Sequence, residues 1–154
     1  MQRRHFLQAF GSTAALAALL GSGLLRPTQA LAVEFNRAAF DARSASDALR
    51  LIGASAAEAS KDILLKAPEI AENGASVPIE VISLIPGTTR LSVLVDKNPA
   101  PLALQFNFGP EAQARFSARL RLAETSRLRV VASVGNRHYT VFREVKITVG
   151  GCAE

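Results

Sequence analysis

Apolar residues alternate with polar ones over most of the chain from Asp62 onward, and this period of two limits the possible fold most strongly. Side chains of a β-strand point alternately to opposite faces, so the alternation predicts strands with one buried face. Turn-forming pairs separate the strands: Asn73-Gly74, Pro86-Gly87, Gly109-Pro110 and Gly135-Asn136. The pattern predicts about seven short strands and an all-β fold, an immunoglobulin-like antiparallel β-sandwich.

The printed sequence contains one cysteine among 154 residues, so an intrachain disulfide cannot stabilise this sandwich. Its stability must then come from apolar faces that two sheets bury against each other. One such face is formed by Val77, Ile79 and Val81. Pro78 lies among them, and because proline has no N–H group to donate to a neighbouring strand, we expect this strand at a sheet edge.

The segment before the alternating pattern, residues 33–61, is rich in alanine and serine and contains one helical pattern. Ser46 can cap this helix, Asp47 suits its positive end and Gly53 can end it. Its apolar surface would come from Leu49, Leu51 and Ile52. We therefore expect a short N-terminal helix that belongs to the same domain, which would extend over residues 33–149.

The first 32 residues have the features of an export signal. Gln2-Arg3-Arg4-His5-Phe6-Leu7-Gln8 resembles the twin-arginine motif, and the apolar run from Ala14 to Leu25 is too short for a stable membrane span. Ala30-Leu31-Ala32 has the small-x-small pattern of a cleavage site. We expect residues 1–32 to be a twin-arginine signal peptide cleaved near Ala32, which places the mature chain in the periplasm. An uncleaved anchor is the alternative.

The formal net charge is +5, but Arg3, Arg4 and Arg26 lie in the leader, which contains no acidic residue. After removal of residues 1–32 the chain keeps 15 basic and 13 acidic side chains. The positive charge therefore belongs largely to the leader, and it does not indicate a protein that binds nucleic acid.

Arginine is concentrated in the last third of the chain, at positions 115, 119, 121, 127, 129, 137 and 143. Arg119 and Arg121 end one expected strand, and Arg127 and Arg129 begin the next after a short turn. On facing strands these like charges would repel. A solvated face, an acidic partner surface and attraction of small anions toward the C-terminal segment are three explanations that stay open.

The single cysteine, Cys152, directly follows Gly150-Gly151. Glycine has little conformational preference, so these two residues predict a hinge, and residues 150–154 are expected to form a flexible carrier arm. A thiol on such an arm can carry a covalent group to other proteins. An accidental thiol and an intermolecular disulfide are the alternatives. Catalysis by Cys152 is disfavoured, because a hinge does not hold a base beside the sulfur.

Other reactive groups are few. His138 is the one histidine outside the leader, and we expect it to be hydrogen-bonded or to face solvent. No G-x-S-x-G motif accompanies it, and one histidine with one cysteine cannot form an ordinary zinc or iron–sulfur site. No glycine-rich phosphate loop opens a helix. The sequence therefore indicates no catalytic residue, no metal ligand set and no cofactor site.

Several stretches together resemble the SoxY family, the sulfur-carrying subunits of the Sox thiosulfate-oxidation system. They are the twin-arginine leader, Lys66-Ala67-Pro68-Glu69-Ile70-Ala71-Glu72-Asn73-Gly74, Glu80-Val81, Val95-Asp96-Lys97-Asn98-Pro99 and Gly150-Gly151-Cys152. The resemblance covers essentially the whole mature chain. Members of the family usually end Gly-Gly-Cys-Gly-Gly, whereas Ala153-Glu154 follows the cysteine here.

The resemblance implies an immunoglobulin-like domain that forms a heterodimer with a SoxZ-like subunit exported alongside it. It implies that Cys152 bears the pathway intermediates. A SoxAX-like haem enzyme would join thiosulfate to the thiol, a SoxB-like enzyme would hydrolyse off sulfate, and a SoxCD-like enzyme would oxidise the remaining sulfur. The chain would then be a carrier subunit and not an enzyme. The alternative is an exported immunoglobulin-like binding module whose cysteine only forms an intermolecular disulfide.

Overall fold

A computed structural model of the chain describes residues 35–148. The chain divides into two units, Met1–Phe35 and Asn36–Glu154, and every helix and strand described below belongs to the second. The predicted signal peptide, residues 1–32, and the predicted arm, residues 150–154, lie outside the described residues and stay predictions.

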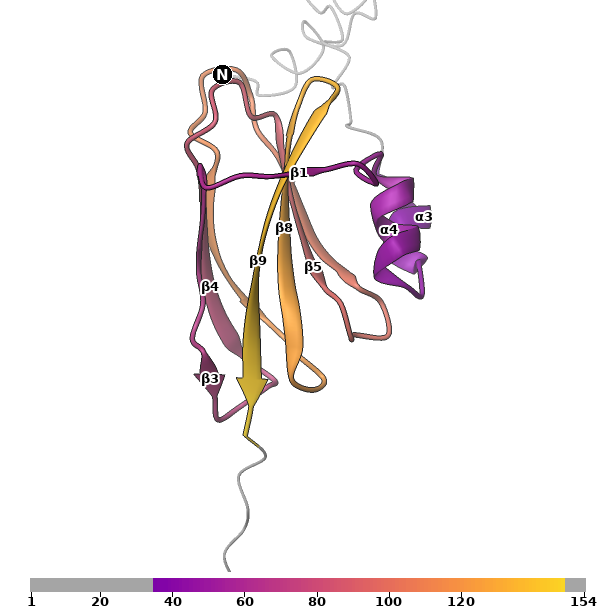
Figure 1. Cartoon of the computed structure of the whole chain (residues 1–154), viewed down its shortest axis with the longest axis vertical. Coiled ribbons are helices and arrows are strands. Elements are labelled where there is room, and N and C mark those ends of the chain that lie inside the picture. Colours follow the sequence, from indigo (N-terminus) through magenta and orange to yellow (C-terminus); the bar gives the residue numbers. More distant parts are fainter. Residues whose placement is uncertain (1–34, 149–154) are drawn as a thin grey trace, which may run out of the picture. The chain divides into compact units, whose positions relative to one another are not determined.

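The strands form two sheets that face each other (Figure 1). The large sheet has the order β1 (Glu58–Ala59), β9 (Arg137–Ile147), β8 (Ser126–Val134), β5 (Arg90–Val95) and β6 (Leu102–Asn107), and β3 (Ile70–Ala71) also pairs with β9. The small sheet has the order β2 (Ile63–Lys66), β4 (Val77–Ser83) and β7 (Arg115–Leu120). The predicted all-β sandwich is confirmed.

The core between the sheets follows the period of two seen in the sequence. On β4, Val77, Ile79 and Val81 are buried, and on β8 the same holds for Leu128 and Val130. Side chains between them point outward, because successive side chains of a strand lie on opposite faces. Burial of these alternating residues is the main stabilising contribution that a sandwich without a disulfide can have.

Strands β8 and β9 form the longest hairpin of the molecule. Their register pairs Val134 with Arg137, so Gly135 and Asn136 make a two-residue turn, as predicted. Gly135 has a φ of 57°, which is a conformation that glycine adopts without strain. This turn lies at one end of the sandwich, and β9 ends at the opposite end beside β3 (Figure 1).

Pro78 was expected on an edge strand, but β4 is the central strand of the small sheet, so that prediction is wrong. The proline is tolerated because the β2–β4 register ends at the pair of Lys66 and Glu80. From Val77 to Ile79, β4 has a strand neighbour only on the β7 side, where Pro78 pairs with Arg119. Pro78 therefore lies where one side of β4 is locally an edge.

Two strand pairings were not foreseen. The short strands β1 and β3 both pair with β9 in parallel, whereas all other pairings are antiparallel. The segments are only two residues long, and neither shows the alternation that marks the longer strands in the sequence. They nevertheless occupy the edge of β9 that β8 leaves open.

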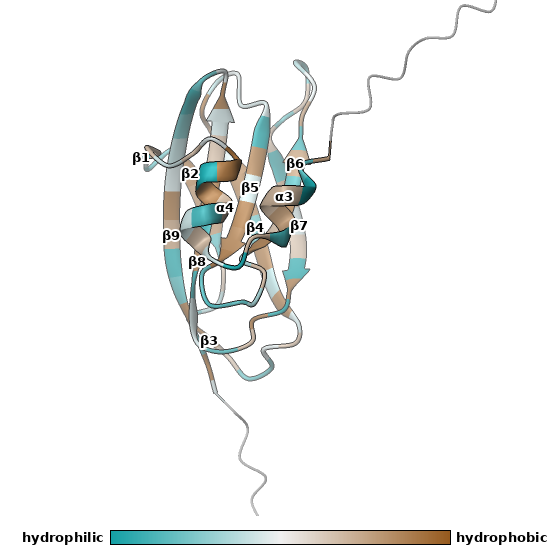
Figure 2. Cartoon of the chain, turned by 90° about the vertical axis from the view of Figure 1, so that its right-hand side faces the viewer, coloured by the Kyte–Doolittle hydropathy of each residue, from teal (hydrophilic) through white to brown (hydrophobic). Residues whose placement is uncertain are grey.

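Two short helices, α3 (Arg37–Asp41) and α4 (Ala45–Leu51), pack on the outer face of the large sheet, where the sequence had indicated one (Figures 1 and 2). A second core forms beneath them, and its buried members from the sheet are Leu94, Leu102 and Val131. Within residues 35–148, no helix is both long and apolar enough to cross a membrane.

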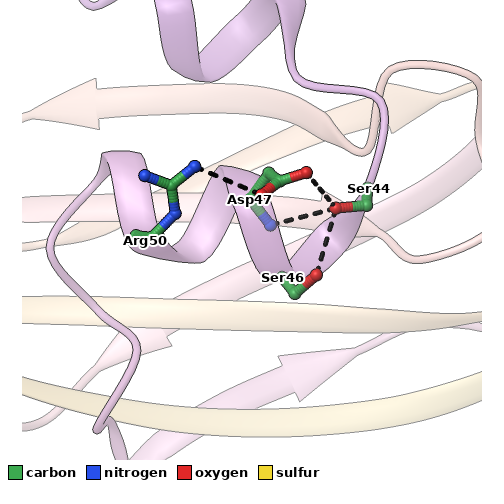
Figure 3. A network of polar contacts seen from close by, with 4 residues as sticks. All are labelled: Ser44, Ser46, Asp47 and Arg50. Atoms are coloured by element: carbon green, nitrogen blue, oxygen red, sulfur yellow. Dashed lines mark hydrogen bonds and ion pairs between the residues drawn. The ribbon is translucent and has the colours of Figure 1, made fainter.

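The cap of α4 is Ser44 and not Ser46, which corrects the sequence prediction. Ser44 Oγ accepts a hydrogen bond from the Asp47 N–H at 3.1 Å, while Ser46 only contacts Ser44 Oγ (Figure 3). The helix therefore starts two residues earlier than the sequence suggested. The hydrogen bond from Ser44 and the neighbouring Arg50 hold the pKa of Asp47 below its ordinary value.

Replacing Leu128 with alanine should lower the free energy of unfolding by about 2–5 kcal/mol, because the side chain is fully buried between the sheets. The matched control is Leu64→Ala in β2, where the leucine is 40% exposed and the loss should stay below about 1 kcal/mol. Urea denaturation of the mature protein measures both values. Equal losses would contradict the assigned core.

Candidate functional site

Strand β9 leads directly into the Gly-Gly-Cys segment, so the end of this strand defines where that segment begins. Thr148 is the last described residue, and Cys152 follows four residues later. Four residues span at most ~14 Å at ~3.6 Å each, which limits how far the Cys152 Cα can lie from that of Thr148. Gly150, Gly151 and Cys152 themselves lie outside the described residues.

The end of β9 is held on both sides. On one side, the Lys146 N–H donates to the Glu69 carbonyl at 2.8 Å, and the Thr148 N–H donates to the Ala71 carbonyl at 3.1 Å. On the other side, the Ile147 N–H donates to Thr125 Oγ1 at 2.9 Å. The backbone therefore stays hydrogen-bonded up to the last described residue.

The Asn73-Gly74 turn packs against this end of the strand. The Leu122 N–H donates to the Gly74 carbonyl at 2.7 Å, and Asn73 Oδ1 accepts a hydrogen bond from the Ala75 N–H. A Cβ atom at position 74 would lie 2.6 Å from the Leu122 carbonyl oxygen and 3.3 Å from Ile147 Cγ2. Gly74 does not have a positive φ, so glycine is needed here for close approach.

Asn98 holds the segment that follows β7. Its Nδ2 donates to the Arg121 carbonyl at 2.7 Å, and its Oδ1 accepts from the Ala123 N–H at 3.0 Å. One side-chain amide thus satisfies a backbone acceptor and a backbone donor two residues apart, which fixes residues 121–123 in place. Asn98 belongs to the Lys97-Asn98-Pro99 stretch on which the family resemblance partly rested.

These segments surround a cleft of about 300 Å³, which we call the root cleft. Its lining residues are Glu72, Asn73, Gly74, Ala75, Arg121, Leu122, Ala123, Ile147 and Thr148. Two stretches of the family resemblance therefore meet here. One supplies Asn73 and Gly74, which line the cleft, and the other supplies Asn98, which binds the backbone carbonyl of the lining residue Arg121. Sequence reasoning noted both stretches but did not place them together, because the contact joins residues far apart in the chain.

The root cleft contains two charged side chains, Arg121 and Glu72, and both residues are exposed. In the described part of the chain, the Arg121 guanidinium makes no hydrogen bond or ion pair. A guanidinium with unused N–H groups is the side chain best suited to bind a carboxylate, phosphate or sulfonate.

The other arginines of the last third do not form one face, so the expectation of like charges on facing strands is wrong. Strand β7 belongs to the small sheet and β8 to the large sheet. Arg127 lies over the Phe142 ring at 4.6 Å, and Arg129 pairs with Asp96 at 3.3 Å. Arg143 Nη1 donates to the Ala67 carbonyl at 3.2 Å. The arginines therefore lie on both sheets, and these three have separate partners.

His138 is hydrogen-bonded, as expected: its Nδ1 lies 2.9 Å from Ser133 Oγ. It follows the β8–β9 turn near the start of β9, whereas Ile147 of the root cleft is the last residue of that strand. Nowhere in residues 35–148 do three or more His, Cys, Asp or Glu side chains gather as metal ligands would.

The model of the family described as "Sulfur oxidation protein SoxY" matches residues 48–152. The chain belongs to the SoxY family. That match covers more than half of the chain and extends to Cys152, so the resemblance noted in the sequence is confirmed.

A solved SoxY structure agrees with the family assignment. The structure of the sulfur carrier protein SoxY from Chlorobium limicola f thiosulfatophilum shares 40% sequence identity with this chain and has a TM-score of 0.63. The similarity covers 71% of this chain and 96% of that SoxY chain. A search of curated proteins found no match.

Replacing Gly74 with alanine should destabilise the protein by about 1–3 kcal/mol, because the new Cβ would be forced against the Leu122 carbonyl oxygen. The amide hydrogens of Leu122 and Thr148 should exchange faster with solvent in this variant. Gly109→Ala is the control, because a Cβ there meets nothing within 4 Å. Native-state hydrogen exchange measures both variants. Unchanged protection of the Leu122 amide hydrogen in Gly74→Ala would contradict the close packing of Gly74 against Leu122.

Proposed function

We propose that this chain is a sulfur carrier protein that holds thiosulfate-derived intermediates covalently on Cys152. The observation that carries the proposal is the SoxY family match, because it includes Cys152 at its last position. The solved SoxY relative with 40% identity is itself described as a sulfur carrier protein. The chain supplies no second candidate for the carrier group, since Cys152 is the one cysteine in its sequence.

The chemistry needs a thiolate, and it needs a segment long enough to bring that thiolate into the active sites of partner enzymes. Joining the Cys152 thiolate to thiosulfate forms a sulfur–sulfur bond and releases two electrons, which a SoxAX-like haem enzyme would accept. A SoxB-like enzyme would then use water to cleave the bond to the terminal sulfonate, and sulfate would leave while a persulfide stays on Cys152. A SoxCD-like enzyme would oxidise that persulfide sulfur. The carrier contributes the nucleophile and its delivery, and the enzymes contribute the catalytic groups.

The hinge and the root have separate roles in this proposal. Gly150 and Gly151 would let the thiol turn into a partner's active site, and the hydrogen-bonded end of β9 would keep the starting point constant. A constant starting point raises the effective concentration of the thiol at a docked enzyme, because the arm then explores only a sphere of limited radius. The ~14 Å reach beyond Thr148 suits an active site that lies inside a channel.

We also propose a heterodimer with a SoxZ-like subunit in the periplasm. Large apolar side chains lie exposed on the described domain, with Leu64 at 40%, Phe142 at 57% and Ile70 at 59%. They come from β2, β9 and β3, whose segments adjoin along one side of the sandwich. Exposed apolar residues gathered in one region favour a protein partner. The twin-arginine leader supports export of an already folded pair.

Cys152→Ser should abolish thiosulfate-dependent turnover in a reconstituted Sox system while its thermal melt overlaps that of the unchanged protein. Serine keeps the size of the side chain but offers no sulfur to form the disulfide-type adduct. The intact mass of protein from thiosulfate-grown cells should also show sulfur-containing adducts on Cys152 that a reductant removes. Finding only the mass of a disulfide-linked dimer would support the binding module instead.

The mature chain should co-purify with a smaller subunit that has no signal peptide of its own, at a 1:1 ratio. Leu64→Glu combined with Phe142→Glu should weaken the association at least about tenfold, because two exposed apolar contacts would become charged. Arg137→Glu, at the N-terminal end of β9, serves as the control. Light scattering measures the assembly, and a stable monomer from native expression would contradict the heterodimer.

A further inference from the structure

We propose that the free edge of β7 binds an extended, acidic segment of a partner protein, which adds to the small sheet as a further strand. The residues that define this edge are Arg115, Ser117 and Arg119, and we call it the β7 edge. It lies apart from the surface assigned above to the heterodimer, because β7 and β2 flank β4 on opposite sides.

The backbone of β7 has hydrogen-bonding groups without a partner on this edge. Among the described residues β7 is the end strand of the small sheet and pairs only with β4. The Ala114 carbonyl accepts a hydrogen bond from the Ser83 N–H of β4 at 2.8 Å, so the even-numbered residues direct their backbone groups toward β4. Successive residues of a strand point these groups to opposite edges, so the N–H and C=O groups of Ser117 and Arg119 face the free edge.

Such an edge matches a polypeptide and no other class of ligand. Ser117 and Arg119 each offer one N–H and one C=O, and a peptide backbone supplies the complementary acceptors and donors at the same spacing. A phosphate or a nucleic-acid backbone would satisfy the N–H groups, but its negative oxygens would oppose the carbonyl oxygens beside them.

The side chains of the β7 edge favour acidic residues in the added strand. Arg115 and Arg119 are exposed. Within residues 35–148 the Arg115 guanidinium has no hydrogen bond or ion pair, and Arg119 contacts only Ser76 Oγ, at 3.3 Å. Glu80 of the neighbouring strand is already paired with Lys66 at 2.9 Å. Carboxylates opposite the two arginines would therefore gain charge-assisted hydrogen bonds.

The other face of the same edge is apolar. Phe116 of β7 packs against Phe106 of β6 with ring centroids 4.3 Å apart, and Phe106 is still 37% exposed. Strand β6 ends the large sheet as β7 ends the small one, so no described strand covers these rings. Because side chains of an added strand alternate between faces, its apolar residues would meet the rings while its acidic residues meet the arginines. The occupant therefore alternates apolar and acidic residues.

A second copy of this chain does not fit the β7 edge. Two β7 strands paired antiparallel about Ser117 would place Arg115 of one copy opposite Arg119 of the other, and like charges in that position are destabilising. Charged residues on an end strand prevent such self-pairing. The arginines thus oppose a copy of the chain and attract an acidic partner.

The experiment uses the mature protein, with its partner subunit where that co-purifies, and a blocked probe peptide of alternating valine and glutamate. The probe is matched in length to the six residues of β7. Hydrogen exchange of the Ser117 and Arg119 amides should slow at least about tenfold when the probe saturates the protein. The Ala118 amide already faces β4 and should not change. A peptide of alternating valine and lysine should not bind.

Ser117→Pro removes the N–H that faces the free edge but no hydrogen bond to β4, so it should abolish binding of the probe, whereas Ser117→Ala should not. Arg115→Gln combined with Arg119→Gln should weaken binding at least about tenfold at low salt, because both counter-charges are lost. Arg37→Gln combined with Arg137→Gln removes the same charge from α3 and β9 and should weaken binding less than about twofold.

Absence of saturable binding would overturn the inference, and so would binding that Ser117→Pro leaves unchanged. If Ser117→Pro does not fold, a probe methylated at every backbone nitrogen makes the same test, because it keeps the side chains and loses the N–H donors. Equal affinity of the methylated probe would overturn strand addition. Slow exchange at Ser117 that needs no probe and rises with protein concentration would assign the edge to a second copy and also overturn the inference.

Discussion

The hydrogen bonds along β9 are the interaction on which the rest of this structure depends. Strand β8 pairs with β9 from Ser126 to Val134, and β1 and β3 bind the opposite edge of the same strand. This arrangement places β9 inside the large sheet and not at its edge, so its backbone groups are satisfied on both sides at each end. Because β9 is also the last strand among the described residues, its hydrogen bonds determine where the segment that carries Cys152 begins.

Close packing holds the end of β9 against the neighbouring segments. The absence of a side chain at Gly74 lets two backbones approach until the Leu122 N–H reaches the Gly74 carbonyl at 2.7 Å, and Asn98 fixes the neighbouring segment through two hydrogen bonds. A carrier gains from such a base, because a mobile cysteine delivers its cargo efficiently only if its anchor does not move as well. Rigidity at the root and freedom at the hinge are thus complementary requirements of the proposed function.

The two outer faces of the sandwich differ in a way that bears on partners. Helices α3 and α4 cover part of the large sheet and form a second core with it, whereas no described element covers the outer face of the small sheet. That outer face carries Leu64 next to the ion pair of Lys66 and Glu80 at 2.9 Å. The Lys66 contact holds the pKa of Glu80 below its ordinary value, so the Glu80 carboxylate keeps its charge at neutral pH. Mixed apolar and charged surface of this kind is typical of protein interfaces.

The sequence by itself determined the longer strands, the two-residue turn at Gly135 and the family, because alternation, turn residues and motifs are local properties of the chain. It also singled out the stretches around Asn73 and Asn98. Only the tertiary structure decided that these stretches meet Arg121 at the root of the C-terminal segment, that β1 and β3 run parallel to β9, and that Pro78 is tolerated in a central strand. The physical reason is that long-range pairing depends on which edges and backbone groups remain free after the local elements form, and a one-dimensional pattern does not contain that information.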